Sequence, residues 1–137
     1  MNSYVKELPF SLSIEKEVKE LVILVGTKRG AFIFFSDSQR KFWEVNGPHL
    51  LGYSVNNFIF DDRDQKTIIL TIQNGDSNQH LIYTSNDFGK HWIPSKIDNQ
   101  INEKAQVNCI ARGSRDDKNT FFAGLSSGEI IYSTDKG

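Results

Sequence analysis

Residues 85–92 read SNDFGKHW and place a serine, an aspartate, a glycine and a tryptophan at fixed offsets along the chain. The same offsets begin again at residue 133, where STDKG ends at residue 137. An earlier, degenerate copy, SDSQRKFW, occupies residues 36–43 and has Ser38 and Arg40 where the aspartate and the glycine would stand. The serines that open the three copies are 49 and 48 residues apart. A recurrence at this spacing indicates a repeat architecture.

A second similarity supports the same period. VNNFIFDDRDQKTIIL at residues 55–70 matches VNCIARGSRDDKNTFFA at residues 107–123 with one inserted residue. The stretches VNNFIF, TIILTIQ, QHLIYTS and KHWIPSK are short, rich in β-branched and aromatic residues, and separated by polar turns, which is typical of strands. Four short antiparallel strands in each repeat of this length are typical of a β-propeller blade.

The sequence therefore predicts an all-β fold of four-stranded antiparallel propeller blades. We expect a single partial propeller over residues 1–137, with blades at about 8–46, 54–98 and 106–137 and a first strand at 8–13. The third blade would lack its fourth strand, so about two and three-quarter blades leave a ring of the usual ~4 to 8 blades incomplete. We expect an amino-terminal fragment of a longer propeller, or partial rings that assemble in trans through their open edges. A small β-sandwich is the alternative fold, and it leaves the period unexplained.

Composition excludes several classes of function. Sixteen basic and seventeen acidic residues give a net charge of −1 without a basic stripe, so we expect no nucleic-acid partner. The longest apolar run, LVILVG from Leu21, is too short to span a bilayer, and no signal peptide is visible, so we expect a cytoplasmic protein without a membrane partner. The single cysteine, Cys109, is expected to be a small buried hydrophobic residue, and the spacing of histidines and cysteines predicts neither a metal site nor a cofactor.

The repeated motif resembles the Asp-box, or BNR repeat, of sialidases, sortilin-type receptors and photosystem II assembly-factor propellers. Its aspartate suits an acceptor for backbone N–H groups across a turn, its glycine permits positive φ, and its tryptophan offers a large apolar surface. We therefore expect a structural role, without catalytic residues, for the nine box positions: Ser36, Trp43, Ser85, Asp87, Gly89, Trp92, Ser133, Asp135 and Gly137. The Arg63–Asp64 and Arg115–Asp116 pairs also recur, and we expect them to be turn residues that form surface ion pairs.

Residues that occur once, on the face opposite the boxes, are the candidates for ligand binding. They are Lys28 and Arg29 in the turn GTKRG, and His49 and Tyr53 in the link NGPHLLGYSV. A cationic pair suits a carboxylate or a phosphate. The alternative is that the link only sets a turn, with Leu50 and Leu51 filling the blade interface, and that the basic pair is simply solvated.

A closer resemblance covers residues 21–95. LVGTKRG, the GPHLLG link and the DDRD turn look like the amino-terminal end of a bacterial family of BNR-repeat propellers labelled glycosyl hydrolase or sialidase-like. The resemblance implies a longer full-length protein and little chemistry of its own.

Two functions follow as hypotheses. The first is a non-catalytic propeller that holds a glycan, a peptide or a protein partner on the face opposite the boxes. The alternative is the amino-terminal part of a sialidase-like glycosidase, which would need three converging arginines, an acid/base carboxylate and a tyrosine–glutamate pair. Of these arginines only Arg29 is well placed, so catalytic residues would have to lie beyond residue 137.

Overall fold

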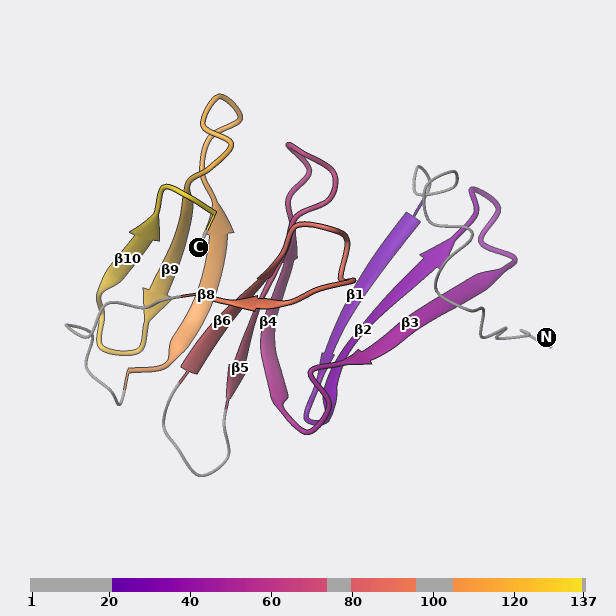
Figure 1. Ribbon diagram of the computed structural model, residues 1–137, viewed down its shortest axis with the longest axis horizontal. Coiled ribbons are helices and arrows are strands. Elements are labelled where there is room, and N and C mark those ends of the chain that lie inside the picture. Colours follow the sequence, from indigo (N-terminus) through magenta and orange to yellow (C-terminus); the bar gives the residue numbers. More distant parts are fainter. Residues whose placement is uncertain (1–20, 74–79, 96–104, 137) are drawn as a thin grey trace.

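The computed structural model describes residues 21–73, 80–95 and 105–136, and its strands form three antiparallel sheets (Figure 1). Sheet 1 contains β1 (Leu21–Thr27), β2 (Gly30–Ser36) and β3 (Trp43–His49); sheet 2 contains β4 (Ser54–Phe60), β5 (Ile68–Gln73), β6 (His80–Ser85) and β7 (Ile93–Pro94); sheet 3 contains β8 (Val107–Arg112), β9 (Phe121–Leu125) and β10 (Ile130–Ser133). The first strand expected at 8–13 lies outside the described residues. The part of the chain that is described contains no helix long and apolar enough to cross a membrane.

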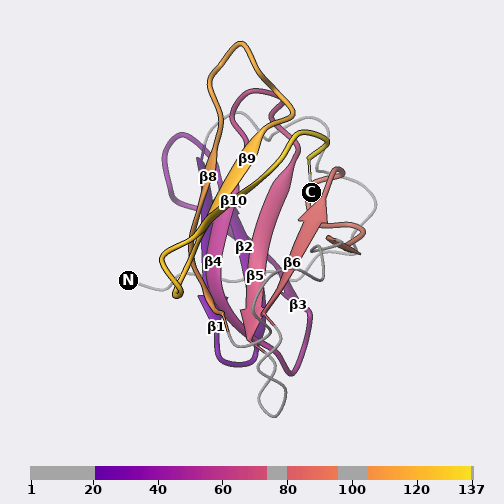
Figure 2. The ribbon, with the colours of Figure 1, turned by 90° about the vertical axis from the view of Figure 1, so that its left-hand side faces the viewer.

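The three sheets stand side by side in chain order, with sheet 2 between the other two (Figures 1 and 2). Within each sheet, strands that follow one another in the chain are hydrogen-bonded neighbours. The serine that opens each box occupies the same register, opposite the first residue of the preceding strand: Ser36 opposite Leu21, Ser85 opposite Ile68, and Ser133 opposite Phe121. The sequence period is therefore a structural period.

Sheets 1 and 2 meet through an apolar interface. Ile33, Ile68 and Phe88 form a buried cluster between them. The Phe88 ring lies 5.4 Å from the ring of Phe35 in sheet 1 and 5.4 Å from that of Phe60 in sheet 2, measured between centroids. Removal of such aromatic and aliphatic surface from water is the main force that holds the two sheets together.

Sheets 2 and 3 meet through a polar interface at the end where the chain turns from β4 to β5. The guanidinium group of Arg63 lies 2.7 Å from the Asp61 carboxylate, and the two side chains are only 2% and 0% exposed. Arg63 also donates hydrogen bonds to the carbonyl oxygens of Ser114 (3.1 Å) and Asp117 in sheet 3, and it lies over the Phe121 ring. Hydrogen bonding to Asp61 raises the pKa of Arg63 above its already high ordinary value. Arg63 therefore joins two sheets as a buried cation.

The expectation of surface ion pairs is wrong for Arg63. Its partner is Asp61 rather than Asp64, and the pair is buried. The physical reason is long-range: the carbonyl oxygens that accept the remaining N–H groups come from the loop between β8 and β9, about fifty residues away in sequence. A more exposed pair, Arg112 with Asp62 (2.7 Å), bridges the same two sheets.

Cys109 is exposed, which corrects the expectation of a buried residue. The cause is a β-bulge between Val107 and Cys109, where the pairing register shifts. Val107 pairs with Leu125 and is buried, whereas Cys109 pairs with Gly124 on the other face of the sheet. One extra residue in a strand moves the residues that follow to the opposite face.

We predict that Arg63→Ala lowers the free energy of unfolding by about 3–5 kcal/mol, because it leaves the buried Asp61 carboxylate without its cation. Urea unfolding followed by tryptophan fluorescence measures the change. Arg115→Ala is the matched control, because Arg115 is exposed in the next loop, and it should stay within about 0.5 kcal/mol of the unmodified protein. Equal, small effects of the two substitutions would contradict the role given to Arg63.

Candidate functional site

The box at residues 85–92 is a hydrogen-bonded turn between β6 and β7. The Ser85 hydroxyl donates to the Asp87 carboxylate (2.8 Å) and accepts from the backbone N–H of Gly89 (2.7 Å). Asp87 in turn accepts from the backbone N–H of His91 (2.9 Å). Trp92 packs against the buried clusters between sheets 1 and 2. Each of these contacts closes or anchors the turn.

The box that opens at Ser133 repeats this pattern in sheet 3. The Ser133 hydroxyl donates to the Asp135 carboxylate at 2.6 Å. The backbone N–H of Lys136 donates to the carbonyl of Asn119 (3.0 Å), as that of Phe88 donates to the carbonyl of Lys66 (3.1 Å). Gly137 lies outside the described residues.

The degenerate box at residues 36–43 forms its turn with a different aspartate. The Ser36 hydroxyl donates to the Phe42 carbonyl (2.7 Å), and Asp37 accepts from the backbone N–H of Lys41 (3.1 Å). Asp37 thereby makes the bond that Asp87 makes to His91, also four residues ahead. Arg40 has a φ of 56°, so a non-glycine residue occupies the left-handed region where the glycine would stand. Alignment at fixed offsets points to Ser38 and misses Asp37, one residue earlier.

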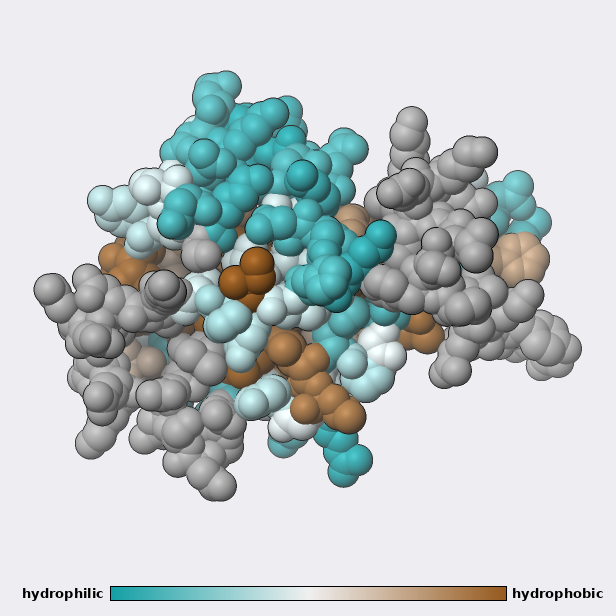
Figure 3. Space-filling view, in the orientation of Figure 1, coloured by the Kyte–Doolittle hydropathy of each residue, from teal (hydrophilic) through white to brown (hydrophobic). Residues whose placement is uncertain are grey.

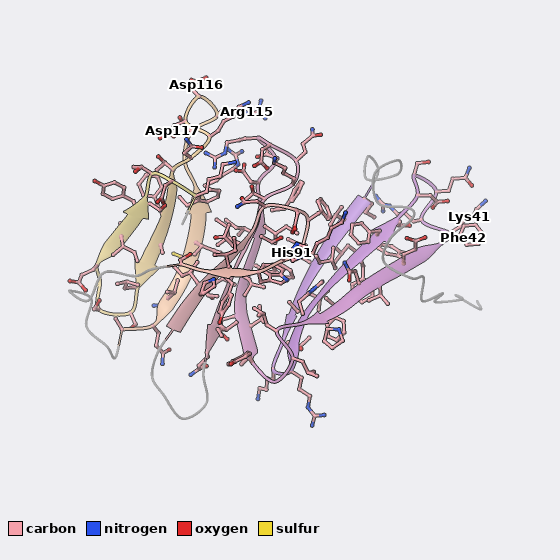
Figure 4. The ribbon with its side chains drawn as sticks, in the orientation of Figure 1. Lys41, Phe42, His91, Arg115, Asp116 and Asp117 are labelled. Carbon is pink, nitrogen blue, oxygen red and sulfur yellow. The ribbon has the colours of Figure 1, made fainter. Side chains whose placement is uncertain are left out.

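Three aspartates have clearly shifted pKa values, and all three shifts are downward. Burial alone would raise the pKa of Asp87, but hydrogen bonds from His91 and Ser85 lower it overall. The pKa of Asp117 is lowered mainly by the hydrogen bonds that this carboxylate accepts from the Thr120 hydroxyl and the Asn119 backbone N–H. A carboxylate with a lowered pKa is ionised at neutral pH and lacks the proton that a general acid must donate. These carboxylates act as hydrogen-bond acceptors in turns. Figure 4 shows Asp117 with Arg115 and Asp116 in the loop between β8 and β9.

Asp64 and Lys136 form an ion pair between sheets 2 and 3. The ammonium nitrogen of Lys136 lies 2.8 Å from the Asp64 carboxylate, and both side chains are mostly buried. Burial alone would raise the pKa of Asp64, but the bonds from Lys136, Thr67 and the backbone N–H of Lys66 hold it well below its ordinary value. Because the folded pKa is below the unfolded one, this pair stabilises the fold above about pH 4, and its contribution is lost as the pH falls further.

We predict that Lys136→Met lowers the free energy of unfolding by about 1–2 kcal/mol at neutral pH, and that the gap narrows in acid once the pH falls below the folded-state pKa of Asp64 in the variant. Urea unfolding at a series of pH values measures the gap. Lys41→Met, at an exposed position in sheet 1, is the control and should show little effect at any pH. A gap that stays constant through the protonation of Asp64 in the folded variant would mean that lost packing, rather than charge, causes the effect.

Gly89 is required by both its backbone and its surroundings. Its φ is +87°, and a Cβ atom there would lie 2.8 Å from Cδ1 of the fully buried Ile33. Gly128, in the turn between β9 and β10, has nearly the same φ, +89°, and nothing within 4 Å of the equivalent position. A side chain at Gly128 would meet only backbone strain, whereas one at Gly89 would meet both backbone strain and steric crowding.

We predict that Gly128→Ala costs about 1–2 kcal/mol of stability, from φ alone. Gly89→Ala should cost a further ~1–3 kcal/mol, because the new methyl group displaces Ile33 at the interface between sheets 1 and 2. Thermal and urea unfolding of the two variants compare these costs directly. Equal losses would show that the box glycine is needed only for its backbone conformation.

The opposite end of the sheets carries the residues predicted to bind a ligand. Lys28 and Arg29 form the exposed turn between β1 and β2 (Figure 1). The Thr27 hydroxyl donates to the Gly30 carbonyl (2.7 Å) and accepts from the backbone N–H of Arg29 (3.1 Å). The backbone N–H of Gly52 donates to the Arg29 carbonyl (3.3 Å), so the turn is held against the link between β3 and β4. The structure therefore brings together the two segments that the sequence singled out.

His49 and Tyr53 differ from the cationic pair in their exposure. β3 continues to His49, so GPH is the end of a strand rather than part of a free link. The half-buried His49 ring lies 5.6 Å from that of Trp92, and burial lowers the pKa of His49. Its Nε2 atom is buried and has no hydrogen-bond partner among the described residues. Tyr53 and Leu50 pack against the cluster that contains Val55, whereas Leu51 is exposed. Leu50 thus fills the interface and Leu51 does not.

Neither a metal nor a carboxylate pair suggests itself at this end. Over residues 21–73, 80–95 and 105–136, histidines, cysteines and acidic residues do not gather in groups of three or more that would hold a metal ion. The groups at this end that suit a ligand are the side chains of Lys28 and Arg29, which can form charge-assisted hydrogen bonds with carboxylates or phosphates. Figure 3 shows that hydrophilic side chains dominate the other end, over the turns between β4 and β5 and between β8 and β9.

A solved structure, described as YCF48 bound to D1 peptide, superimposes on most of this chain. The match has a TM-score of 0.58 and 16% sequence identity, and it covers 88% of this chain. The three sheets are β-propeller blades. They do not close a ring, and the chain covers 35% of the YCF48 chain. No protein-family model matches the sequence, and no curated protein sequence is similar to it. The all-β propeller fold predicted from the repeat is thus confirmed, in a chain that resembles one of the BNR-type propellers.

Proposed function

We propose that this chain is a non-catalytic propeller module that binds an acidic peptide segment of a protein partner. The binding surface is the end of the sheets where Lys28 and Arg29 lie on the turn between β1 and β2. The observation that carries the proposal is the fixed position of this turn: the Gly52-to-Arg29 hydrogen bond ties it to the link, and a Cβ atom at Gly30 would lie only 2.7 Å from the His49 carbonyl. A fixed turn presents both cations from a defined backbone position, so no backbone entropy of the turn is lost on binding.

Among the turns that join the second and third strands of a blade, only that of the first blade carries basic residues. The turn between β9 and β10 contains Ser126, Ser127 and Glu129, and the sequence NGDSNQ between β5 and β6 has no basic residue either. A feature that the repeat does not require is more informative about function than one that it does. The guanidinium group of Arg29 suits bidentate contact with a carboxylate, and Lys28 adds a second point charge. The exposed Leu51 beside them offers apolar contact to a peptide side chain.

A peptide ligand is favoured because YCF48, which shares the blade architecture, was solved with a D1 peptide bound. The hydrogen bonds that lower the pKa of Asp64, Asp87 and Asp117 also occupy these carboxylates within turns and ion pairs, which favours a binding role over a hydrolytic one. We further propose a cytoplasmic location, which rests on the sequence alone.

We predict that Lys28→Glu/Arg29→Glu weakens peptide binding at least tenfold, which corresponds to about 1.4 kcal/mol. Fluorescence anisotropy with labelled peptides of graded net charge, the D1 peptide among them, gives the affinities. Acidic peptides should bind best, with an affinity that falls as salt is added. Lys41→Glu/Lys118→Glu, at exposed positions at the other end of the sheets, is the matched control and should stay within about twofold of the unmodified protein. Equal weakening by both double variants would place the site elsewhere.

A further inference from the structure

Sheet 3 has one buried face and one exposed apolar face. Val107, Ala123, Leu125 and Ile131 belong to the cluster that packs against Ile82 of sheet 2. The residues that alternate with them point the other way: Phe122 is 40% exposed, Ile130 73% and Tyr132 70%. The rings of Phe122 and Tyr132 lie 6.3 Å apart on this outer face. Figure 2 looks onto the sheet 3 side of the molecule, and Figure 3 shows hydrophobic side chains over β10.

The same face is covered in sheet 2. Counting from the box serines, which share one register, Phe122 takes the place of Ile69 and Ile130 takes the place of Ile82. Ile69 is only 3% exposed, and Ile82 packs against sheet 3. The outer face of sheet 3 therefore repeats, residue for residue, a surface that elsewhere in this chain is covered by the next blade.

The complementary surface lies on sheet 1. Val22, Leu24, Ile33 and Phe35 pack toward sheet 2, so Ile23 and Val25 of β1 point away from it. In the register of the box serine, Ile23 and Val25 take the places of Leu70 and Ile72. Leu70 and Ile72 are fully buried in the cluster that joins sheet 2 to Ala31 of sheet 1. Sheet 1 thus carries apolar residues where a blade contacts the blade before it.

We infer that sheet 3 of one chain docks on sheet 1 of a second copy, head to tail. The contact continues an interface that the chain already forms twice internally, between sheets 1 and 2 and between sheets 2 and 3. Burial of Phe122, Ile130 and Tyr132 against Ile23 and Val25 supplies the driving force. Such a contact is heterologous, so it extends the assembly until the ring closes. Two copies, each contributing the three sheets of its described residues, would give six blades, within the usual range of about 4 to 8.

Oligomeric state is the first test, with light scattering after size exclusion and sedimentation velocity at increasing concentration. The 15.6 kDa chain should associate into multiples of its mass. Ile130→Lys should reduce association at least tenfold, because it places a charge in the apolar contact. Ile93→Lys is the matched control: Ile93 is also an exposed strand isoleucine, 57% exposed, but it lies in β7 of sheet 2. Circular dichroism checks that both variants fold.

Disulfide trapping tests the head-to-tail geometry. In a Cys109→Ser background, Ile23→Cys/Ile130→Cys should give covalent multimers on mild oxidation, since the two positions meet only between copies. Ile93→Cys/Ile130→Cys should give none, and Ile130→Cys alone should give no more than a trace of dimer. A protein that stays monomeric at high concentration, association that survives Ile130→Lys, or crosslinking through Ile130→Cys alone would overturn the inference.

Discussion

Every sheet in this chain depends on contact with the next one, because three or four short strands do not bury enough apolar surface to be stable alone. The box turns set this contact. Phe88 and Lys136 occupy the same box position, have φ values of 61° and 75°, and donate their backbone N–H groups to equivalent carbonyls. From this common geometry each side chain reaches the preceding sheet, Phe88 toward Phe35 and Lys136 toward Asp64. The repeated turn thus reverses the chain and also holds one side chain, Phe88 or Lys136, at each interface between neighbouring sheets.

Features set by local chemistry were predictable from the sequence. A serine, an aspartate and a glycine at fixed offsets are needed wherever the same turn forms, so the period and the all-β blades could be predicted from Ser85, Asp87 and Gly89. The degenerate box shows the limit of that approach, because Asp37 makes the required bond from a shifted position. Features set by distant residues or by register were missed. The partners of Arg63 lie in the loop between β8 and β9, and a bulge, which also occurs at the equivalent position of β4, moves Cys109 to the exposed face.

The candidate site was predicted in part. Sequence reasoning placed Lys28 and Arg29 on a turn next to the His49 link, because the turns between the second and third strands of each blade lie at the same end of a propeller as the links between blades. It did not predict that β3 runs to His49, nor that the His49 ring would lie against Trp92. That contact depends on how far the box turn reaches between sheets 1 and 2, which is a matter of packing rather than of pattern. The cationic turn is therefore exposed, whereas His49 and Tyr53 are partly buried in the fold.

Both interfaces between sheets contain an apolar cluster, and the one between sheets 2 and 3 adds ion pairs. The joint between sheets 1 and 2 is built from phenylalanine, isoleucine and tryptophan, whereas that between sheets 2 and 3 has Arg63, Asp61, Lys136, Asp64, Arg112 and Asp62 at one end. Acid weakens an ion pair by protonating its carboxylate and leaves apolar contacts nearly unchanged. Acid therefore weakens the contact between sheets 2 and 3 through Asp64 and Lys136, whereas the apolar cluster that contains Ala123 and Ile82 still holds the two sheets together.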